Sequence, residues 1–400
     1  MKIAFITYEY PPYCGSGGLG TYAFNIAREL KLLGHTVVIF TPNINRKKIN
    51  HIEQEDNLTI IPIEIEEKLP FKAAIFWYKL DKYVKKYNVL FNFDIIHVNG
   101  ISYWFLRKKI LPIPHVITIH HVAKSAHIFN NYNFINRLLD IGGENGFIIP
   151  SIEKRALYFN NNVITVSNFT KNEITKFYDI NKNNIYVIYN GINFNNRSSN
   201  EEILQFKKQH KLEDKHVILF VGRFSDKRKG FHTLLKSFNI LLNRINAYLL
   251  IVGDGDKTES MEIIKNLGIE EKVNFMGFVD ELTLAKCYQA SDVLVCPSKF
   301  EGFGLSIIEA MYYGKPVVAF NVGAIPEILI DTKNGYLVEA EDIINMADSI
   351  YTLLYNKKLA IDIGMYNIEY VEKSFNWKIS AKSIEEVYKI TLSENNAKKQ

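Results

Sequence analysis

The sequence predicts an α/β protein with two doubly wound parallel-sheet domains. Apolar segments of strand length alternate with amphipathic segments of helix length along nearly the whole chain, which is typical of parallel sheets built from βαβ units. The length of 400 residues corresponds to about two domains of ordinary size. A polar, asparagine-rich segment, Asn190–Asn200, interrupts the alternation near the middle and is interpreted as the linker.

The first half carries seven strand-like segments with helix-like segments between them. The strands are short apolar runs, and the helices place apolar residues three or four positions apart. The expected strands are Lys2–Tyr8, Thr36–Thr41, Leu58–Ile63, Asp94–Val98, His115–His120, Val163–Val166 and Ile185–Ile188. The clearest helices are Gly20–Leu33, Phe71–Tyr87 and Ser167–Phe177.

The second half repeats the pattern. Its expected strands are His216–Gly222, Ala247–Gly253, Val273–Gly277, Val293–Pro297, Pro316–Phe320 and Gly335–Val338. We expect an amino-terminal domain of residues 1–192, to which a helix at about 376–392 returns, a carboxyl-terminal domain of residues 193–375, and an unstructured polar tail, 393–400. Two such sheets would leave a cleft at their facing carboxyl ends, where ligands of open α/β sheets bind.

Composition limits the possible functions. Cys14, Cys287 and Cys296 lack metal-ligand spacing and are expected to be reduced thiols of a cytoplasmic protein. The first residues form a strand rather than a signal peptide, and no apolar run reaches the roughly 18 residues of a membrane-spanning helix. The net charge of +5 is concentrated in the first half of the chain. We expect no nucleic-acid partner.

The most informative segment is Glu301-Gly-Phe-Gly-Leu-Ser-Ile-Ile-Glu309. A strand precedes it and the helix Gly304–Tyr313 follows, so bare backbone N–H groups lie at a helix start, where anions bind. Two carboxylates bracket this turn, and carboxylates accept hydrogen bonds from sugar hydroxyls. The combination indicates a nucleotide sugar, whereas the plainer interpretation is an ordinary turn with two solvated acids.

Gly15-Ser-Gly-Gly18-Leu-Gly20 matches the G-x-G-x-x-G pattern of dinucleotide sites. Six residues separate it from the preceding strand, and Phe40–Pro42 supplies no acid to hold a ribose. These departures argue against NAD. A loop that approaches another phosphate or a sugar, and a tight strand-to-helix turn, both remain open.

A basic loop follows the first strand of the second half. Arg223 and Lys229 flank it, and the helix Phe231–Leu242 comes next. The guanidinium fork and the ammonium charge both suit a diphosphate. A positive charge opposes the dipole at a helix start unless an anion binds beside it. The alternative is a solvated basic turn, of which Lys227 and Arg228 are the expected solvated members.

His120 and His121 end a strand, so at least one imidazole is expected to point into the cleft. There it would hydrogen-bond a sugar hydroxyl or the leaving diphosphate, or serve as a structural histidine. Adjacent strand residues point to opposite faces, so the pair is not a metal site.

The segment 71–87 is a basic amphipathic helix. Its apolar stripe holds Phe76, Leu80, Tyr83, Val84 and Tyr87, and lysines lie off the stripe. Such a helix either packs on the first sheet or rests on an anionic membrane surface. Trp77 and Tyr78, off the stripe, keep the membrane interpretation open.

Taken together, these segments resemble the retaining GT-B glycosyltransferases of family 4, relatives of glycogen and sucrose-phosphate synthases. The likeness covers almost the whole chain. It rests on Glu9-Tyr-Pro-Pro, Gly17-Gly-Leu-Gly20, the strand ending at His120, Val166-Ser-Asn-Phe-Thr170, Tyr189-Asn-Gly-Ile192, Gly222-Arg223, Lys229-Gly230, Val252-Gly-Asp-Gly255, Asn274-Phe-Met-Gly-Phe278, Glu301 with Glu309, Gly314-Lys-Pro-Val-Val318, Gly323-Ala-Ile-Pro-Glu327, Asn334-Gly335 and Phe375-Asn-Trp377.

The resemblance implies roles for individual residues. Glu309 would bind the donor ribose and Glu301 the transferred sugar. Arg223 and Lys229 would neutralise the leaving diphosphate, and His120 would face the sugar. Gly18 is also expected to contact the donor, and its loop would lie beside the acceptor. The backbone at Phe278 and Val279 would read the base. The sugar and diphosphate would be held by the backbone N–H groups of Gly302, Phe303, Gly304 and Leu305. The chain departs from the family at His121, commonly Asp, and at Ala324, commonly Gly.

The expected activity is transfer of a sugar from a nucleoside diphosphate sugar, with a UDP-sugar favoured, to a hydroxyl of a saccharide or lipid-linked acceptor. It would proceed with retention, by a front-face route and without a metal or other cofactor, in synthesis of cell-surface polysaccharide, lipopolysaccharide or glycolipid. The acceptor is expected against 123–159, near Tyr132, Phe134, Arg137 and Arg155. The expected location is cytoplasmic, either free or attached peripherally at the inner face of the membrane. A GT-B epimerase or phosphorylase and a non-catalytic nucleotide-sugar-binding protein are the alternatives.

Overall fold

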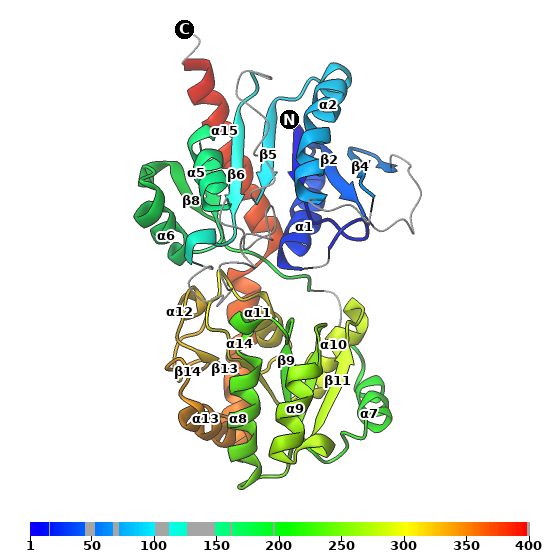
Figure 1. The fold of residues 1–400 in the computed structure, drawn as a ribbon, viewed down its shortest axis with the longest axis vertical. Coiled ribbons are helices and arrows are strands. Elements are labelled where there is room, and N and C mark those ends of the chain that lie inside the picture. The colour runs from blue at the N-terminus through cyan, green and yellow to red at the C-terminus, as the bar shows by residue number, and fades with distance from the viewer. Residues whose placement is uncertain are drawn as a thin grey trace. The chain divides into compact units, whose positions relative to one another are not determined.

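The computed structural model describes residues 1–15, 17–44, 53–66, 72–100, 112–125, 149–160, 162–194 and 197–397. The described residues form two compact units, each with a parallel sheet between two layers of helices (Figure 1). Unit 1 comprises Met1–Gly191 and Trp377–Gln400, and unit 2 comprises Ile192–Asn376.

Unit 1 is built on an eight-stranded sheet in the order β3-β4-β2-β1-β5-β6-β7-β8. All neighbouring strands pair in parallel except β3 and β4, which are antiparallel. The strands are β1 (Lys2–Thr7), β2 (Thr36–Asn43), β3 (Glu53–Glu55), β4 (Leu58–Glu64), β5 (Ile95–Asn99), β6 (His115–Ile119), β7 (Asn162–Thr165) and β8 (Ile185–Val187).

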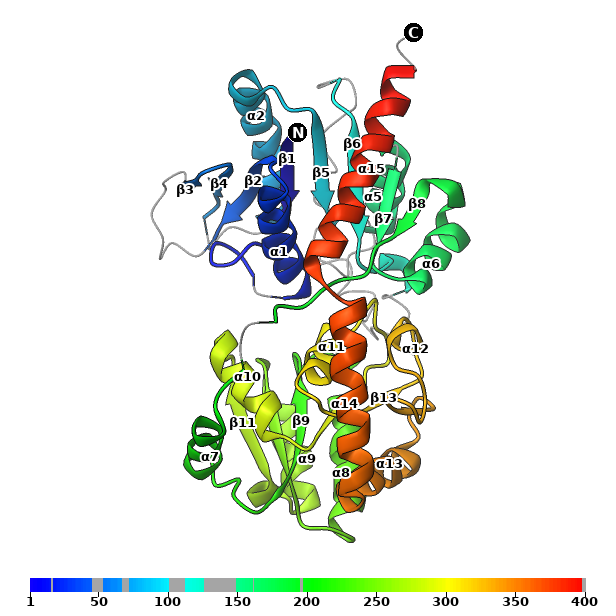
Figure 2. The same ribbon diagram turned by 180° about the vertical axis from the view of Figure 1, so that it is seen from behind.

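Helices cover both faces of this sheet. The side chains of α2, α5 and α6 join one face in a continuous apolar core. On the opposite face α15 lies beside α1 (Figure 2). Among its described residues, unit 1 has the helices α1 (Gly18–Leu32), α2 (Lys72–Phe91), α5 (Ile149–Phe159), α6 (Asn168–Tyr178), the 3-10 turn η1 (Lys182–Asn184) and α15 (Trp377–Ala397).

Unit 2 contains a wholly parallel six-stranded sheet in the order β11-β10-β9-β12-β13-β14. Its strands lie within a residue of the expected ones, because apolar runs of four to six residues buried on both faces are typical of parallel sheets. They are β9 (His216–Val221), β10 (Ala247–Val252), β11 (Val273–Gly277), β12 (Val293–Cys296), β13 (Val317–Phe320) and β14 (Gly335–Val338).

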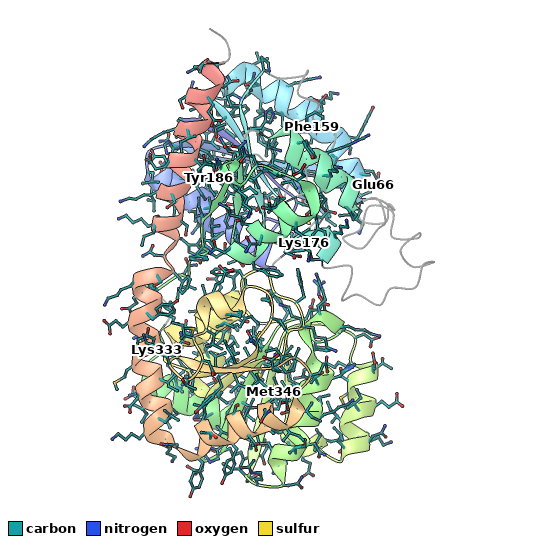
Figure 3. All side chains as sticks on the ribbon, turned by 90° about the vertical axis from the view of Figure 1, so that its left-hand side faces the viewer. Glu66, Phe159, Lys176, Tyr186, Lys333 and Met346 are labelled. Atoms are coloured by element: carbon teal, nitrogen blue, oxygen red, sulfur yellow. The ribbon has the colours of Figure 1, made fainter. Side chains whose placement is uncertain are left out.

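The helices of unit 2 also lie on both faces. On one face, α8, α9 and α13 enclose an apolar core in which Met346 is buried, and Figure 3 shows side chains filling that space. The helical segments are α7 (Asn200–Gln209), η2 (Lys227–Lys229), α8 (Phe231–Leu242), α9 (Thr258–Leu267), η3 (Glu270–Lys272), α10 (Glu281–Ala290), α11 (Leu305–Tyr312), α12 (Ile325–Ile328), α13 (Ile343–Tyr355) and α14 (Lys357–Ser374).

Three sequence-based expectations need correction. The last helix continues to Ala397, so most of the tail expected to be unstructured is helical. The edge strand β3 was missed, because its Glu-Gln-Glu sequence has no apolar pattern. Trp77 is only 6% exposed and belongs to the unit 1 core rather than to a free face of α2. The expected apolar stripe of α2 is indeed turned inward, with Phe76 completely buried.

Candidate active site

The order in which the chain adds strands to the unit 2 sheet reverses between β9 and β12. It proceeds outward from β9 through β10 to β11 and then returns to β12 on the other side of β9. Loops that leave two such strands diverge, and the gap at their carboxyl ends is the usual ligand site of an open α/β sheet. The loops at this position carry Lys229 and Glu301.

Lys229 and Glu301 form an ion pair with 2.7 Å between Nζ and Oε2. Both side chains are largely buried. Burial alone would lower the pKa of Lys229, but the Glu301 carboxylate and other negative groups outweigh it and leave the pKa above its ordinary value. The structure therefore brings together two predicted site residues that stand 72 positions apart in the sequence.

Two glycines hold the Glu301 loop in place. Gly230 has φ +64°, and a Cβ there would lie 1.9 Å from the carbonyl oxygen of Pro297. On the other side, a Cβ at Gly323 would lie 2.3 Å from the carbonyl oxygen of Glu301, which accepts a 2.9 Å hydrogen bond from the Ala324 amide. Only glycine permits both close approaches, so these positions fix the backbone that carries Glu301.

Arg223 extends from the same β9 loop but remains 67% exposed, with Nε 3.6 Å from Asp254. An exposed pair at this distance is weak, so the guanidinium is available to a stronger anion. Arg228 is not the solvated residue that the sequence predicted. Its guanidinium bonds both carboxylate oxygens of Asp226, with a shortest distance of 2.7 Å. This pair closes the loop between Arg223 and Lys229.

The helix α11 begins directly after the Glu301 turn. Gly304 precedes it with φ +110°, a conformation that favours glycine. Phe303 is buried and packs edge-to-face on Phe375, with ring centroids 5.9 Å apart. The turn is thus anchored by an aromatic side chain, while its backbone leads into the positive end of the helix dipole.

One turn into α11, Glu309 is largely buried and accepts a 2.6 Å hydrogen bond from the hydroxyl of Tyr288. Tyr288 stacks on Tyr313 with ring centroids 5.5 Å apart. Burial, together with the charge of Glu281, raises the pKa of Glu309 to about 7 against the opposing effect of the Tyr288 bond. The sequence predicted Glu309, but nothing in it pointed to Tyr288.

Phe278 and Val279 follow β11 at the edge of the sheet. Phe278 is 68% exposed, unusually open for a phenylalanine, and Gly277 before it has φ +71°. The segments that follow β9, β11 and β12 thus carry every residue of unit 2 that was expected to bind the donor, whereas Gly18 lies in unit 1.

Unit 1 has its own reversal point between β1 and β5. Here the carboxylate of Glu9 lies at the amino terminus of α1 and accepts a 3.3 Å hydrogen bond from the Gly20 amide. A Cβ at Gly15 would lie 2.7 Å from Glu9, and one at Gly17 3.0 Å from its Oε2. The glycine loop therefore wraps around a carboxylate of the chain itself, and Glu9 was not predicted as part of this loop.

His120 follows β6 at the same edge and is half-buried. Its Nε2 is 2.7 Å from Oδ1 of Asn99, and its ring packs edge-to-face on Tyr22 with centroids 4.8 Å apart. Burial, with a smaller contribution from His121, lowers the pKa of His120 to about 3. The imidazole is therefore neutral at physiological pH.

Part of the expected acceptor region lies outside the described residues, including Tyr132, Phe134 and Arg137, whereas Arg155 is exposed on α5. Across the described ranges, no three His, Cys, Asp or Glu side chains are grouped to hold a metal ion. None of the described helices is long and apolar enough to cross a membrane.

Comparison with known protein families identifies the family to which this chain belongs. Residues 16–196 match the model of Glycosyltransferase Family 4, and residues 201–370 match that of Glycosyl transferases group 1. The chain is a family 4 glycosyltransferase. An uncharacterized glycosyltransferase of Methanocaldococcus jannaschii is 31% identical to it, over 98% of this chain and 99% of the relative. A D-inositol 3-phosphate glycosyltransferase of Corynebacterium diphtheriae is 28% identical over 97% of this chain and 94% of its own length.

The solved structures confirm the GT-B fold of the glycosyltransferase. Sucrose-phosphate synthase from Thermosynechococcus elongatus superposes with a TM-score of 0.83, at 23% identity over 98% of this chain and 99% of the other. WaaG, a glycosyltransferase involved in lipopolysaccharide biosynthesis, gives a TM-score of 0.74 at 17% identity over 96% and 99% of the two chains. At these identities the likeness establishes the fold and leaves the substrates to the site itself.

Proposed function

We propose that this glycosyltransferase transfers a sugar from a nucleoside diphosphate sugar to a hydroxyl group, with retention of the anomeric configuration. The observation that carries the proposal is the Lys229–Glu301 ion pair at the reversal point between β9 and β12. A cation suited to a diphosphate and a carboxylate suited to sugar hydroxyls are held there side by side, which matches the two ends of such a donor.

Lys229 and Arg223 are assigned to the diphosphate. As the bond between the anomeric carbon and the phosphate oxygen breaks, its electron pair passes to the diphosphate, and fixed positive groups stabilise the growing charge. In a front-face route, the acceptor oxygen bonds the same face of that carbon and its proton passes to the departing phosphate oxygen. Glu301 and the backbone of Gly302, Phe303, Gly304 and Leu305 are assigned to the sugar and diphosphate.

Glu309 is assigned to the ribose and the backbone at Phe278 and Val279 to the base. From unit 1, His120 is assigned to the sugar and Gly18 to the acceptor side, as the family resemblance implies. A UDP-sugar is favoured as donor. Anabaena HepE, of the same fold at 20% identity and a TM-score of 0.74, was solved with UDP-glucose. A plant starch synthase of the same fold was solved with ADP, so the fold alone does not select the base.

No divalent metal is needed in this proposal, because Arg223 and Lys229 carry the positive charge that a metal otherwise supplies. The test is a thermal-shift panel of nucleoside diphosphates and their sugars, each with and without EDTA. Binding to the folded state raises the unfolding midpoint, and the rise grows with the logarithm of the ligand concentration relative to Kd. A selective rise that survives EDTA is the expected result. A rise that needs a divalent ion would overturn metal independence, and no rise with any nucleotide would overturn the donor site.

Retention has a test of its own. NMR spectroscopy of the product, with the donor as reference, shows whether the anomeric configuration is kept. An inverted product would rule out the front-face route even if the donor site is correct.

We further propose a saccharide or glycolipid acceptor in cell-surface polysaccharide, lipopolysaccharide or glycolipid synthesis, with unit 1 resting on the inner face of a membrane. The outward face of α2 carries exposed Tyr78, 80% accessible, among exposed lysines. Such a face suits anionic lipid headgroups. The lysines are Lys79, Lys82, Lys85 and Lys86. Cosedimentation with phosphatidylglycerol vesicles should fall when Lys82 and Lys86 are changed to Glu, and unchanged cosedimentation would refute membrane contact through α2.

A further inference from the structure

Asn99 lies at the end of β5 with its side chain completely buried between β1, α1 and β6. Its amide makes three hydrogen bonds to residues that the structure describes. Nδ2 is 3.0 Å from Oγ1 of Thr7 and 3.1 Å from the carbonyl oxygen of Leu19. Oδ1 is 2.7 Å from Nε2 of His120. Thr7 ends β1, Leu19 lies at the start of α1 and His120 follows β6, so the partners come from three different segments.

The orientation of this amide follows from its partners. The carbonyl oxygen of Leu19 can only accept a hydrogen bond. The Thr7 hydroxyl donates its single proton to the carbonyl oxygen of Glu9 at 2.8 Å, so toward Asn99 it too must accept. Both atoms therefore require the NH₂ end of Asn99, and the amide oxygen must face His120.

The amide oxygen in turn determines the proton on His120. An oxygen that can only accept requires a donor, so Nε2 of His120 carries a hydrogen. A neutral imidazole has one N–H, which leaves Nδ1 as a bare acceptor. Tyr22 supports the ring from its edge, and the Tyr22 hydroxyl is itself 3.0 Å from Oγ1 of Thr118.

We propose that Asn99 is a positioning residue that fixes neutral His120 in the tautomer protonated at Nε2. The proposal rests on the proposed function in one respect, namely that His120 meets the donor. A bare Nδ1 accepts a hydrogen bond and repels a phosphate oxygen. This fixing of the His120 tautomer by Asn99, called the lock below, therefore selects a sugar hydroxyl as the partner of His120 and rejects the diphosphate. The residue type alone left both partners open.

The first test is the imidazole itself. In protein labelled with ¹⁵N-histidine, long-range ¹H–¹⁵N spectra show which ring nitrogen is protonated, and His120→Gln identifies the signals. Wild-type protein should show a protonated Nε2 and a bare Nδ1 from pH 6 to pH 8. Asn99→Leu should give mixed tautomers or protonation at Nδ1. A wild-type ring protonated at Nδ1, or an unchanged ring in Asn99→Leu, would overturn the proposal.

A buried asparagine is also structural, so a matched variant is needed. Asn162 on β7 is equally buried and donates to Thr391 at 2.9 Å without contacting His120. Asn162→Leu should lower the unfolding midpoint as Asn99→Leu does but leave the His120 tautomer unchanged. If Asn99→Leu does not fold, Asn99→Asp takes its place. Its carboxylate still accepts from Nε2 and should raise the His120 pKa measured in the same spectra, whereas an unaltered titration would contradict the contact.

The second test separates the lock from the proposed function. A nucleoside diphosphate lacks the transferred sugar and so cannot make the hydroxyl contact. Asn99→Leu should therefore weaken binding of the nucleotide sugar about tenfold while leaving binding of the nucleoside diphosphate unaffected. Equal weakening of both would contradict the hydroxyl assignment. Failure of the wild-type protein to bind any nucleotide would refute the proposed function, while the tautomer spectra would still confirm or refute the lock.

Discussion

The hydroxyl of Tyr288 donates a 2.6 Å hydrogen bond to Oε2 of Glu309, and this bond ties the carboxylate on α11 to the helix α10. Tyr288 is almost completely buried and Glu309 largely so, so neither side chain can exchange this partner freely for water. Only part of the acceptor capacity of Glu309 is occupied, because a carboxylate has two oxygens with two lone pairs each. The Tyr288 bond thus favours the charged carboxylate against the burial that raises the pKa of Glu309.

Removal of that hydroxyl should weaken nucleotide binding. In Tyr288→Phe the bond that favours the charged carboxylate is lost, so the pKa of Glu309 should rise above its value of about 7. A protonated acid accepts ribose hydroxyls less well, and we expect about a tenfold loss of affinity at pH 7 that is largely recovered at pH 9. Isothermal titration calorimetry with the nucleotide sugar measures both values.

The matched control is Tyr248→Phe. Tyr248 lies on β10 of the same unit, and its hydroxyl is 3.4 Å from Lys272 rather than near Glu309. Its affinity should equal that of wild type at both pH values. An affinity loss in Tyr288→Phe that does not change with pH would show that the ring packing, rather than the Glu309 charge, had been altered.

The wild-type protein should itself bind the donor in a pH-dependent way. Ribose hydroxyls stabilise the carboxylate form of Glu309, so affinity should rise with pH up to about 7 and level off above it. Below that value the affinity should fall by up to about tenfold per pH unit. An intact nucleotide sugar is the correct probe, because its diphosphate has no terminal group that titrates in this range. Glu309→Gln should bind more weakly and without this pH dependence.

The sequence predicted the two sheets and the parallel direction of every strand except β3, and it singled out Lys229 and Glu301, which the structure brings together. These features depend on local information, namely apolar runs, glycine positions and the residues that follow each strand. Tyr288 and Asn99 were not predicted, because a buried tyrosine in a helix or a buried asparagine after a strand has no distinctive local pattern. Their roles arise from partners 21 positions away along the chain, Glu309 and His120 respectively.

Glu153 should make the stability of the protein decrease as the pH rises. This side chain is 0% exposed, and burial raises its pKa to about 7 although Tyr178 and the Ala123 amide donate hydrogen bonds to it. Between the ordinary pKa of 4.5 and about 7 the folded state binds more protons than the unfolded state, so unfolding becomes easier as the pH increases through this window.

Glu153→Gln removes this titration. The variant should be more stable than wild type at pH 8, by up to roughly 3 kcal/mol, and the difference should shrink or reverse at pH 5. Urea unfolding at both values provides the measurement, and Glu262→Gln on the exposed face of α9 is the control. A constant difference between Glu153→Gln and wild type at all pH values would mean that hydrogen bonding, rather than charge burial, dominates at this position.

Gly230 should be irreplaceable for steric reasons. Gly230→Ala places a methyl group 1.9 Å from the Pro297 carbonyl oxygen in a backbone with φ +64°. Gly268 has nearly the same φ, +67°, but no atom within 4 Å of its Cβ position. Gly268→Ala should therefore cost only the left-handed strain of about 1–2 kcal/mol, and Gly230→Ala should cost clearly more. Equal losses in the free energy of unfolding, measured with urea, would show that the two loops relax at no cost.

The sharpest test of the donor site compares two lysines of the same 3-10 turn. Lys229 is paired with Glu301, whereas Lys227 is exposed. Lys229→Ala should reduce kcat for sugar transfer by about 10²–10³, the effect of deleting one electrostatic contact to a developing charge. Lys227→Ala should leave kcat within about twofold, because a screened surface charge contributes little. Near-native turnover in Lys229→Ala, with wild-type folding by circular dichroism, would remove Lys229 from the mechanism.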